Sequence, residues 1–270
     1  SSTNKGSSWT EPEKLYDRNI NTEYGVTIAA NGNQVVIAWV DSYDIYASHS
    51  QNGGDSWSVP IMLSSEDSGL NYMPEIAYNA DKFHIVWADT SYGESVYYTQ
   101  SSDGNQWTEA VTINNDPNAY YSDSPVISSE GNNLYVAWTG NGNYDGDNSN
   151  DYDIIGVVSE DNGLTWNTEK VFIDTDTNYN NLLPSLASGS GFTYVSYQYY
   201  SEGSYDYYFS YSQDDGGSWS DSFEITDYNN DELSVKYHRM DMVFGDKAHF
   251  AFTEETDITG EDRTDSNIFI

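Results

Sequence analysis

The octapeptide SEDNGLTW at residues 159–166 decides how this chain is expected to fold. Gly163 offers a position at which the backbone can take a positive φ, and Asp161 can turn its carboxylate back onto nearby backbone N–H groups. Ser159 and Thr165 can do the same more weakly, and Trp166 supplies a large apolar side chain. The octapeptide therefore predicts a structural hairpin rather than a catalytic or metal-binding motif.

Variants of this octapeptide recur along the whole chain. They are STNKGSSW at 2–9, SQNGGDSW at 50–57, the shorter SSDGNQW at 101–107, and SQDDGGSW at 212–219. Their tryptophans recur about every fifty residues, a period that indicates stacked or radial units rather than independent domains.

Each repeat unit contains four short runs that are typical of β-strands. A tyrosine-rich run such as YDIYASHS precedes each internal octapeptide, and an apolar run such as FHIVW ends about thirteen residues after a proline. Turn signals rich in Gly, Asn and Asp separate the runs, and helical periodicity is absent. Each unit is therefore predicted to form a small antiparallel sheet.

The repeat resembles the Asp-box (BNR) repeat, S-x-D-x-G-x-[ST]-W, of the sialidase superfamily and other Asp-box β-propellers. The resemblance covers the whole chain, and two of the five copies match the pattern in full. It implies a propeller in which the octapeptides lie on the face away from the ligand.

The two chain ends match consecutive parts of one unit, because Asn267-Ile268-Phe269-Ile270 corresponds to residues 44–47 and Ser1-Ser2 follows on from it. We therefore predict an all-β, five-bladed β-propeller of four-stranded antiparallel blades, with the last blade closed by both chain termini. The single domain spans 1–270, with blades at approximately 16–57, 58–107, 108–166, 167–219, and 220–270 plus 1–15. A fragment of a longer propeller is the alternative.

Composition restricts the partners. With 9 Lys+Arg against 44 Asp+Glu, the net charge of −35 excludes nucleic acid and anionic membrane surfaces as partners and favours cations. No cysteine is present, which excludes disulfides and thiolate metal sites. No apolar run approaches the roughly 20 residues of a membrane span, so direct membrane insertion is not expected. We expect a monomer that is extracellular or on the cell surface, in a saline environment.

One set of predicted loops is long, and this marks the expected ligand face. In the loop at 140–153, acidic and amide side chains alternate with small residues, as oxygen ligands of a calcium ion often do. The candidate metal ligands are Asn143, Asp145, Asp147, Asp151 and Asp153. The alternative is a solvated acidic loop without a metal.

Tyrosines gather in or beside the same loops, where their flat rings could cover the apolar faces of sugars. The candidate ligand-binding residues are Tyr24, Tyr72, Tyr121, Tyr179, Tyr237, His238 and Arg239. The alternative is that these tyrosines pack between blades.

The chain has three arginines, Arg18, Arg239 and Arg263, all on the predicted ligand face. The resemblance to sialidases implies an arginine triad on a sugar carboxylate, with Tyr237 as nucleophile and Glu254 as acidic partner. Neither an Arg-Ile-Pro nor an Arg-Leu-Pro motif is present. The alternative is that the arginines pair with the abundant carboxylates.

The sequence leaves two classes of function. The first is a secreted or cell-surface binding module for carbohydrate or another surface polymer, assisted by calcium. The alternative is a sialidase-like glycoside hydrolase or another glycan-active enzyme, which could use paired carboxylates near the axis.

Overall fold

The structure is a computed structural model that describes residues 6–12, 14–15, 25–65, 69–90, 95–114, 121–141, 151–167, 171–174, 180–201, 204–226, 233–234, 241–244, 248–256 and 265–269. Beyond Thr226 it describes little besides the course of the backbone. No helix in these ranges is long and apolar enough to cross a membrane.

The described residues form strands in the order that the repeat predicts. These are β1 (Val26–Asn31), β2 (Gln34–Asp41), β3 (Asp44–Ser50), β4 (Ile61–Met62), β5 (Asn71–Asn79), β6 (Lys82–Asp89), β7 (Ser95–Ser101), β8 (Val111–Thr112), β9 (Tyr121–Glu130), β10 (Asn133–Asn141), β11 (Tyr152–Ser159), β12 (Val171–Phe172), β13 (Asn180–Gly189), β14 (Phe192–Ser201), β15 (Ser204–Ser212), β16 (Phe223–Glu224), β17 (Leu233–Ser234), β18 (Asp241–Phe244), β19 (Ala248–Thr256) and β20 (Asp265–Phe269).

Consecutive strands pair into four-stranded antiparallel sheets, which confirms the predicted class. The first four sheets are β1–β4, β5–β8, β9–β12 and β13–β16, each a simple meander. In the fifth sheet, β17 and β20 pair with opposite edges of β19, because Glu255 and Thr256 have a partner in each. β18 pairs with the beginning of β19.

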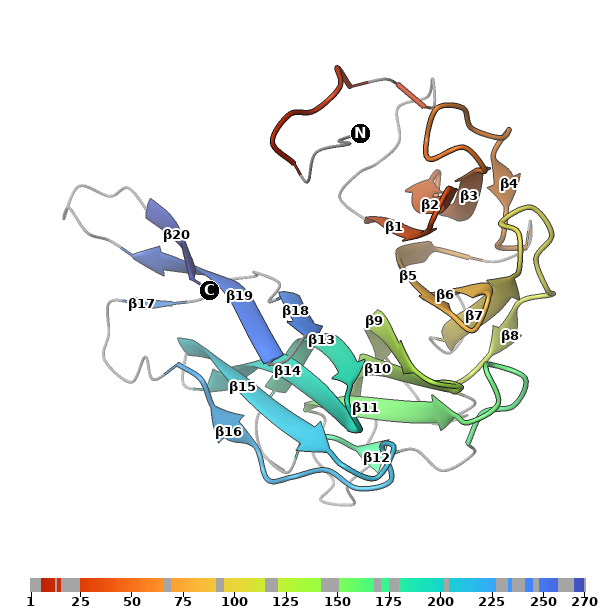
Figure 1. The fold of residues 1–270 in the computed structure, drawn as a ribbon. Coiled ribbons are helices and arrows are strands. Elements are labelled where there is room, and N and C mark those ends of the chain that lie inside the picture. Colours follow the sequence, from red (N-terminus) through yellow and green to blue (C-terminus); the bar gives the residue numbers. More distant parts are fainter. Residues whose placement is uncertain are drawn as a thin grey trace.

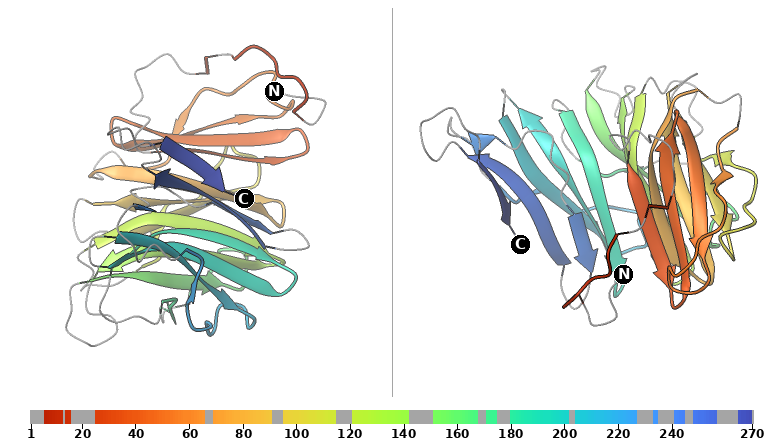
Figure 2. Two further views of the ribbon diagram at one scale, coloured as in Figure 1. Left: turned by 90° about the vertical axis from the view of Figure 1, so that its left-hand side faces the viewer. Right: turned by 90° about the horizontal axis from the view of Figure 1, so that it is seen from above.

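The sheets are arranged around a common centre (Figure 1). Their innermost strands contact one another in the series β1–β5, β5–β9, β9–β13 and β13–β18, while β4, β8, β12 and β16 lie at the outside. Figure 2 shows the sheets as successive layers packed face to face. No strand pairing among the described residues joins the fifth sheet to the first.

The four copies of the octapeptide at 50–57, 101–107, 159–166 and 212–219 form the hairpins that connect the third and fourth strands of a sheet, as the sequence predicts. Ser159 Oγ donates to Asp161 Oδ1 at 2.9 Å and accepts from Gly163 N at 2.8 Å. The Asp161 carboxylate also accepts from Thr165 N and Thr165 Oγ1 at 2.8 and 2.6 Å. These hydrogen bonds, first those from Thr165, lower the pKa of Asp161. The turn is therefore closed by contacts within the octapeptide itself.

The tryptophans that end three of the octapeptides pack into the layer between their own sheet and the preceding one. Trp107 contacts the core between the first and second sheets, Trp166 that between the second and third, and Trp219 that between the third and fourth. Trp166 meets Tyr98 of the preceding sheet edge to face, with ring centroids 4.9 Å apart. The hairpin thus aligns neighbouring sheets as well as neighbouring strands.

The substitution Gly163→Ala tests this alignment of neighbouring sheets, because the added methyl group would overlap the Tyr98 hydroxyl of the neighbouring sheet. Gly191 is the matched control: its φ of 78° is close to the 80° of Gly163, but a methyl group there would meet no atom within 4 Å. We expect Gly191→Ala to cost about 1 kcal/mol, from left-handed backbone alone, and Gly163→Ala roughly 1–3 kcal/mol more. Urea unfolding measures both, and equal losses would contradict the packing role of the hairpin.

Candidate functional site

Three neighbouring innermost strands share an irregularity near their beginning. In β5 the pairing register shifts between Tyr72 and Glu75, and in β13 it shifts between Leu182 and Ser185. In β9 it shifts at the residues that face Ala137–Thr139 of the neighbouring strand β10. At this point Met73, Ser124 and Leu183 take φ angles of 53°, 52° and 53°, and a proline follows each of them. A left-handed residue other than glycine costs on the order of 1–3 kcal/mol and is often found at functional sites. The repeated bulge therefore marks a candidate site.

Two of the tyrosines predicted from the sequence lie at this bulge, together with a third. Tyr121 meets Tyr152 of β11 edge to face at a centroid distance of 5.0 Å. Burial raises the pKa of Tyr121 far above its usual value, with smaller contributions from the charges of Asp123, Tyr72 and Tyr152. Tyr72, Tyr121 and Tyr152 are all half-buried. They form the tyrosine cluster, which spans the second and third sheets.

One carboxylate, that of Asp123, stands beside the tyrosine cluster, and a second, that of Glu75, lies on the adjacent innermost strand. Asp123 Oδ2 accepts a hydrogen bond from the Tyr121 hydroxyl, and its Oδ1 accepts from the Ser124 backbone N–H, both at 2.5 Å. On β5, Glu75 Oε2 accepts from Thr27 Oγ1 of β1 at 3.1 Å. These hydrogen bonds fix the direction in which each carboxylate points. Glu75 and Asp123 are both half-buried, so each can be reached by solvent.

Contacts between strands hold this part of the ring together. Ser124 Oγ donates to Met73 Sδ at 3.2 Å and so joins β9 to β5. Leu183 N donates to Thr139 Oγ1 at 3.0 Å, which joins β13 to β10. Asn180 Oδ1 accepts from Tyr152 N at 3.1 Å. The tyrosine cluster and the two carboxylates therefore lie on a braced framework.

The structure does not place the side chains of the remaining predicted ligand-binding and catalytic residues. Tyr24, Tyr179, Tyr237, His238, Arg239, Arg18 and Arg263 lie outside the described residues. Glu254 lies in β19, at a position described by its backbone alone. The proposed roles of these residues stay predictions.

The predicted calcium loop is described only at its end. Asn143, Asp145 and Asp147 lie outside the described residues, whereas Asp151 is half-buried and Asp153 is 3% exposed near the beginning of β11. Within the described ranges no three His, Asp or Glu side chains gather into a group that could hold a metal ion. Calcium at this loop stays a prediction.

Sequence reasoning missed Glu75, Asp123 and Tyr152. Asp123 follows two residues after Tyr121 and precedes Pro125 by two, so the spacing before the proline could have indicated it. Glu75 and Tyr152 have no such signal, because Glu75 is oriented by a residue of another sheet and Tyr152 joins the site through its contact with Tyr121 on another strand.

No family model matches this chain, and no curated protein matches it. Several solved structures share its fold. A protein of unknown function from Dyadobacter fermentans superposes with a TM-score of 0.63 at 11% identity, covering 91% of this chain and 82% of that one. The alpha-L-arabinanase of Penicillium chrysogenum, solved in complex with arabinobiose, superposes at 0.59 and 13% identity, covering 87% and 75%.

A thermostable family-43 glycoside hydrolase superposes with a TM-score of 0.57 at 13% identity, covering 90% of this chain and 87% of that one. These similarities show the fold, which is the five-bladed propeller of the family-43 glycoside hydrolases.

The expected relationship to the Asp-box (BNR) propellers of the sialidase superfamily is wrong, because the matching structures are five-bladed family-43 propellers and not six-bladed sialidases. The physical reason is that the octapeptide closes its turn with its own side chains, such as Asp161 on Thr165. Such a motif specifies a hairpin and a blade, and it says nothing about the loops at the opposite end of the strands. The fold of this chain is that of a five-bladed glycoside hydrolase propeller.

Proposed function

We propose that this protein is a carbohydrate-active propeller that hydrolyses a neutral polysaccharide, with the sugar bound at the tyrosine cluster. The observation that carries this proposal is that Tyr121, which packs against Tyr152, donates a hydrogen bond to the Asp123 carboxylate on a braced innermost strand, while Tyr72 and Glu75 lie on the adjacent innermost strand. Aromatic rings can cover the apolar faces of a sugar, while carboxylates bind its hydroxyl groups.

The class of substrate is inferred from charge and from the structures of similar fold. A chain with a net charge of −35 repels acidic polysaccharides, so a neutral polymer is favoured. Among the structures that share the fold is an arabinanase complexed with arabinobiose. We therefore propose arabinan, a polymer of a neutral pentose, as the first substrate to test.

The two carboxylates can divide the work of hydrolysis. Asp123 is oriented by two hydrogen bonds and so is suited to take a proton from the attacking water. Glu75, which is half-buried on the adjacent innermost strand, is the group that gives a proton to the leaving glycosidic oxygen. The water oxygen then forms a bond to the anomeric carbon as the glycosidic bond breaks.

A binding module without catalysis is the second candidate function. It is favoured by the engagement of both Asp123 oxygens, one by the Tyr121 hydroxyl and one by the Ser124 N–H. A carboxylate used in this way can orient a tyrosine toward a sugar without taking part in a reaction.

The test measures arabinan cleavage by the release of reducing ends, and arabinobiose binding by calorimetry. We expect Asp123→Asn and Glu75→Gln to reduce cleavage by roughly 10²–10⁴-fold, because each removes one proton-transfer group. Tyr121→Ala should weaken binding by about tenfold or more, whereas Tyr194→Ala, a half-buried tyrosine of the fourth sheet, should leave it unchanged.

The outcomes separate the two candidate functions. Binding that depends on Tyr121, without cleavage, would support the binding module and contradict hydrolysis of arabinan. If the protein neither binds arabinobiose nor cleaves arabinan, both candidate functions are overturned for this polymer.

We also propose that the ring is closed, with the last blade completed by both chain termini. The outward face of the first sheet supports this, because Val26 and Ile28 are 59% and 61% exposed although they are apolar. Ile76, Ile127 and Leu186, at the positions that correspond to Ile28, pack into the cores between sheets. Trp9 and Leu15 of the N-terminal segment line a hollow of about 520 Å³ together with Ile28 and Trp57.

Ile28→Asp tests closure. If the fifth blade covers this face, the new charge becomes buried and thermal stability should fall, by about 2–4 kcal/mol in the free energy of unfolding. Val59→Asp is the control, because Val59 is 84% exposed outside this face. Equally small effects of both substitutions would contradict the closed ring.

We propose, as a separate step, that calcium binds the loop at 140–153. Its support is the alternation of acidic and amide residues that ends in Asp151 and Asp153. We expect calcium to raise the melting temperature over that in a chelator, since binding to the folded state stabilises it. Asp151→Asn should reduce this increase and Asp55→Asn should not; an unchanged midpoint in the wild type would contradict the site.

The blade boundaries, the monomeric state and the extracellular location stay predictions from the sequence.

A further inference from the structure

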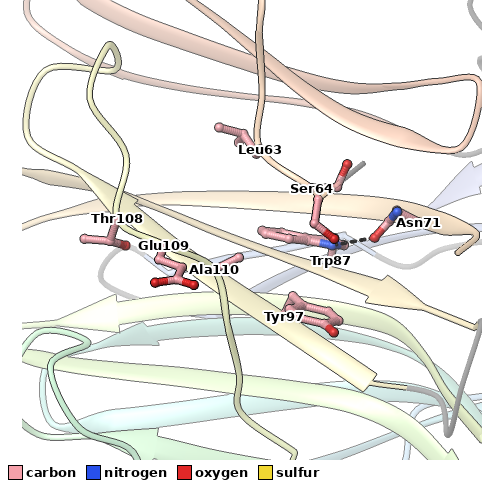
Figure 3. Close-up of a pocket in the computed structure, with 9 residues that line it drawn as sticks. Leu63, Ser64, Asn71, Trp87, Tyr97, Thr108, Glu109 and Ala110 are labelled. Carbon is pink, nitrogen blue, oxygen red and sulfur yellow. Dashed lines mark hydrogen bonds between the residues drawn. The ribbon is translucent and has the colours of Figure 1, made fainter. Parts of the chain in front are cut away.

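A pocket of about 370 Å³ lies between the first and second sheets, toward their outer strands. Figure 3 shows Leu63 and Ser64 of the first sheet on one side and the rings of Trp87 and Tyr97 on the other. Its size falls in the range of about 300–1,000 Å³ that small-molecule sites occupy. It is separate from the tyrosine cluster, which lies at the bulges of the innermost strands.

An aromatic pair forms the floor of this pocket. Trp87 and Tyr97 are direct cross-strand partners in β6 and β7, and their rings lie nearly parallel, 12° apart, at a centroid distance of 5.6 Å. The Trp87 indole N–H donates to Asn71 Oδ1 at 2.9 Å, and Asn71 Nδ2 donates to Tyr43 O at 3.0 Å. Asn71 is fully buried, so the floor is held in place.

A comparison with the fourth sheet explains why this pocket is open beside the second sheet. There the corresponding pair is Tyr197 and Tyr208, and the Tyr197 hydroxyl donates to Ser222 Oγ at 2.5 Å across this position. Ser222 follows its octapeptide tryptophan by three residues, and Ala110 holds the same place after Trp107. Ala110 is too short to bridge this position and has no polar group, so the pocket stays open beside the half-buried Tyr97 ring, whereas Trp87 itself is only 1% exposed.

The polar groups of the pocket are suited to hydroxyl groups. Glu109 is exposed beside the pocket and Tyr97 is half-buried within it. Neither the Glu109 carboxylate nor the Tyr97 hydroxyl has a hydrogen-bond partner among the residues that the structure describes. The hydroxyl of Ser64 is different, because it already accepts from Ile45 N and donates to Asp44. The two groups can therefore donate to and accept from a ligand.

We propose that this pocket is a second carbohydrate site, which holds one sugar residue of a neutral polysaccharide between the first two sheets. The ring of Tyr97 contacts the apolar edge of the sugar, and its hydroxyl together with Glu109 binds sugar hydroxyl groups. A free carboxylate here, in a chain with a net charge of −35, excludes acidic sugars and phosphates. The site would retain the polymer while the tyrosine cluster engages another part of it. The inference rests on the proposed function for the class of ligand.

The experiment uses arabinobiose as the probe and protein labelled with 5-fluorotryptophan. The chain has 8 tryptophans, and Trp87→Phe identifies the fluorine resonance of Trp87. We expect this resonance to shift with arabinobiose in the wild type and in Tyr121→Ala. Ala110→Phe fills the pocket and should abolish the shift. Tyr97→Phe and Glu109→Gln keep the pocket open and should weaken the affinity roughly five- to tenfold, because each removes a hydrogen bond or weakens it.

The result distinguishes this inference from the proposed function. A Trp87 resonance that does not move while calorimetry detects binding through Tyr121 would overturn the second site and leave the proposed function standing. A shift that survives in Ala110→Phe, Tyr97→Phe and Glu109→Gln alike would also overturn it. A Trp87 shift without any effect of Tyr121→Ala on binding would support the second site and count against the tyrosine cluster.

Discussion

The hydrogen bonds inside the octapeptide are the constraint on which the rest of the structure depends. Asp161 fixes the turn by accepting from both the backbone and the hydroxyl of Thr165, and this presents Trp166 to the preceding sheet. The same contacts recur in Ser212, Asp214 and Ser218 ahead of Trp219. Because three of the hairpins insert a tryptophan between two sheets, local turn chemistry sets the spacing of the first four sheets.

This spacing explains why the candidate sites lie where they do. The hairpins occupy one end of the strands, and the cores between sheets fill the middle. The bulges at Met73, Ser124 and Leu183 lie at the other end of the innermost strands, where no octapeptide constrains the backbone. Functional side chains are therefore free to vary there without loss of the framework.

The fold could be predicted from the sequence because its signals are local. The turn at 159–166, the apolar runs and the proline near the beginning of β5, β9 and β13 each act within one unit, and the strands form accordingly. Tyr72 and Tyr121 could be predicted as candidate site residues because long loops mark that end of the strands, and their role stays a prediction. The sialidase relationship was wrong since a local hairpin motif does not report on distant loops. The parts that could not be predicted depend on contacts between strands far apart in the sequence. Glu75 is oriented by Thr27 of the first sheet, and Tyr152 belongs to the candidate site because it meets Tyr121.

The pocket between the first two sheets could not be predicted from local signals either, since it depends on a short side chain at one position between two sheets. In the fourth sheet a tyrosine and a serine close the corresponding space, whereas Ala110 leaves it open above Trp87 and Tyr97. The framework tolerates this difference, because Asn71 and the octapeptide hairpin hold Trp87 and Trp107 independently of what stands at 110. A repeated architecture can thus open a pocket by changing two residues in one unit, here those at Trp87 and Ala110. The place to look for such sites is where one repeat departs from the others.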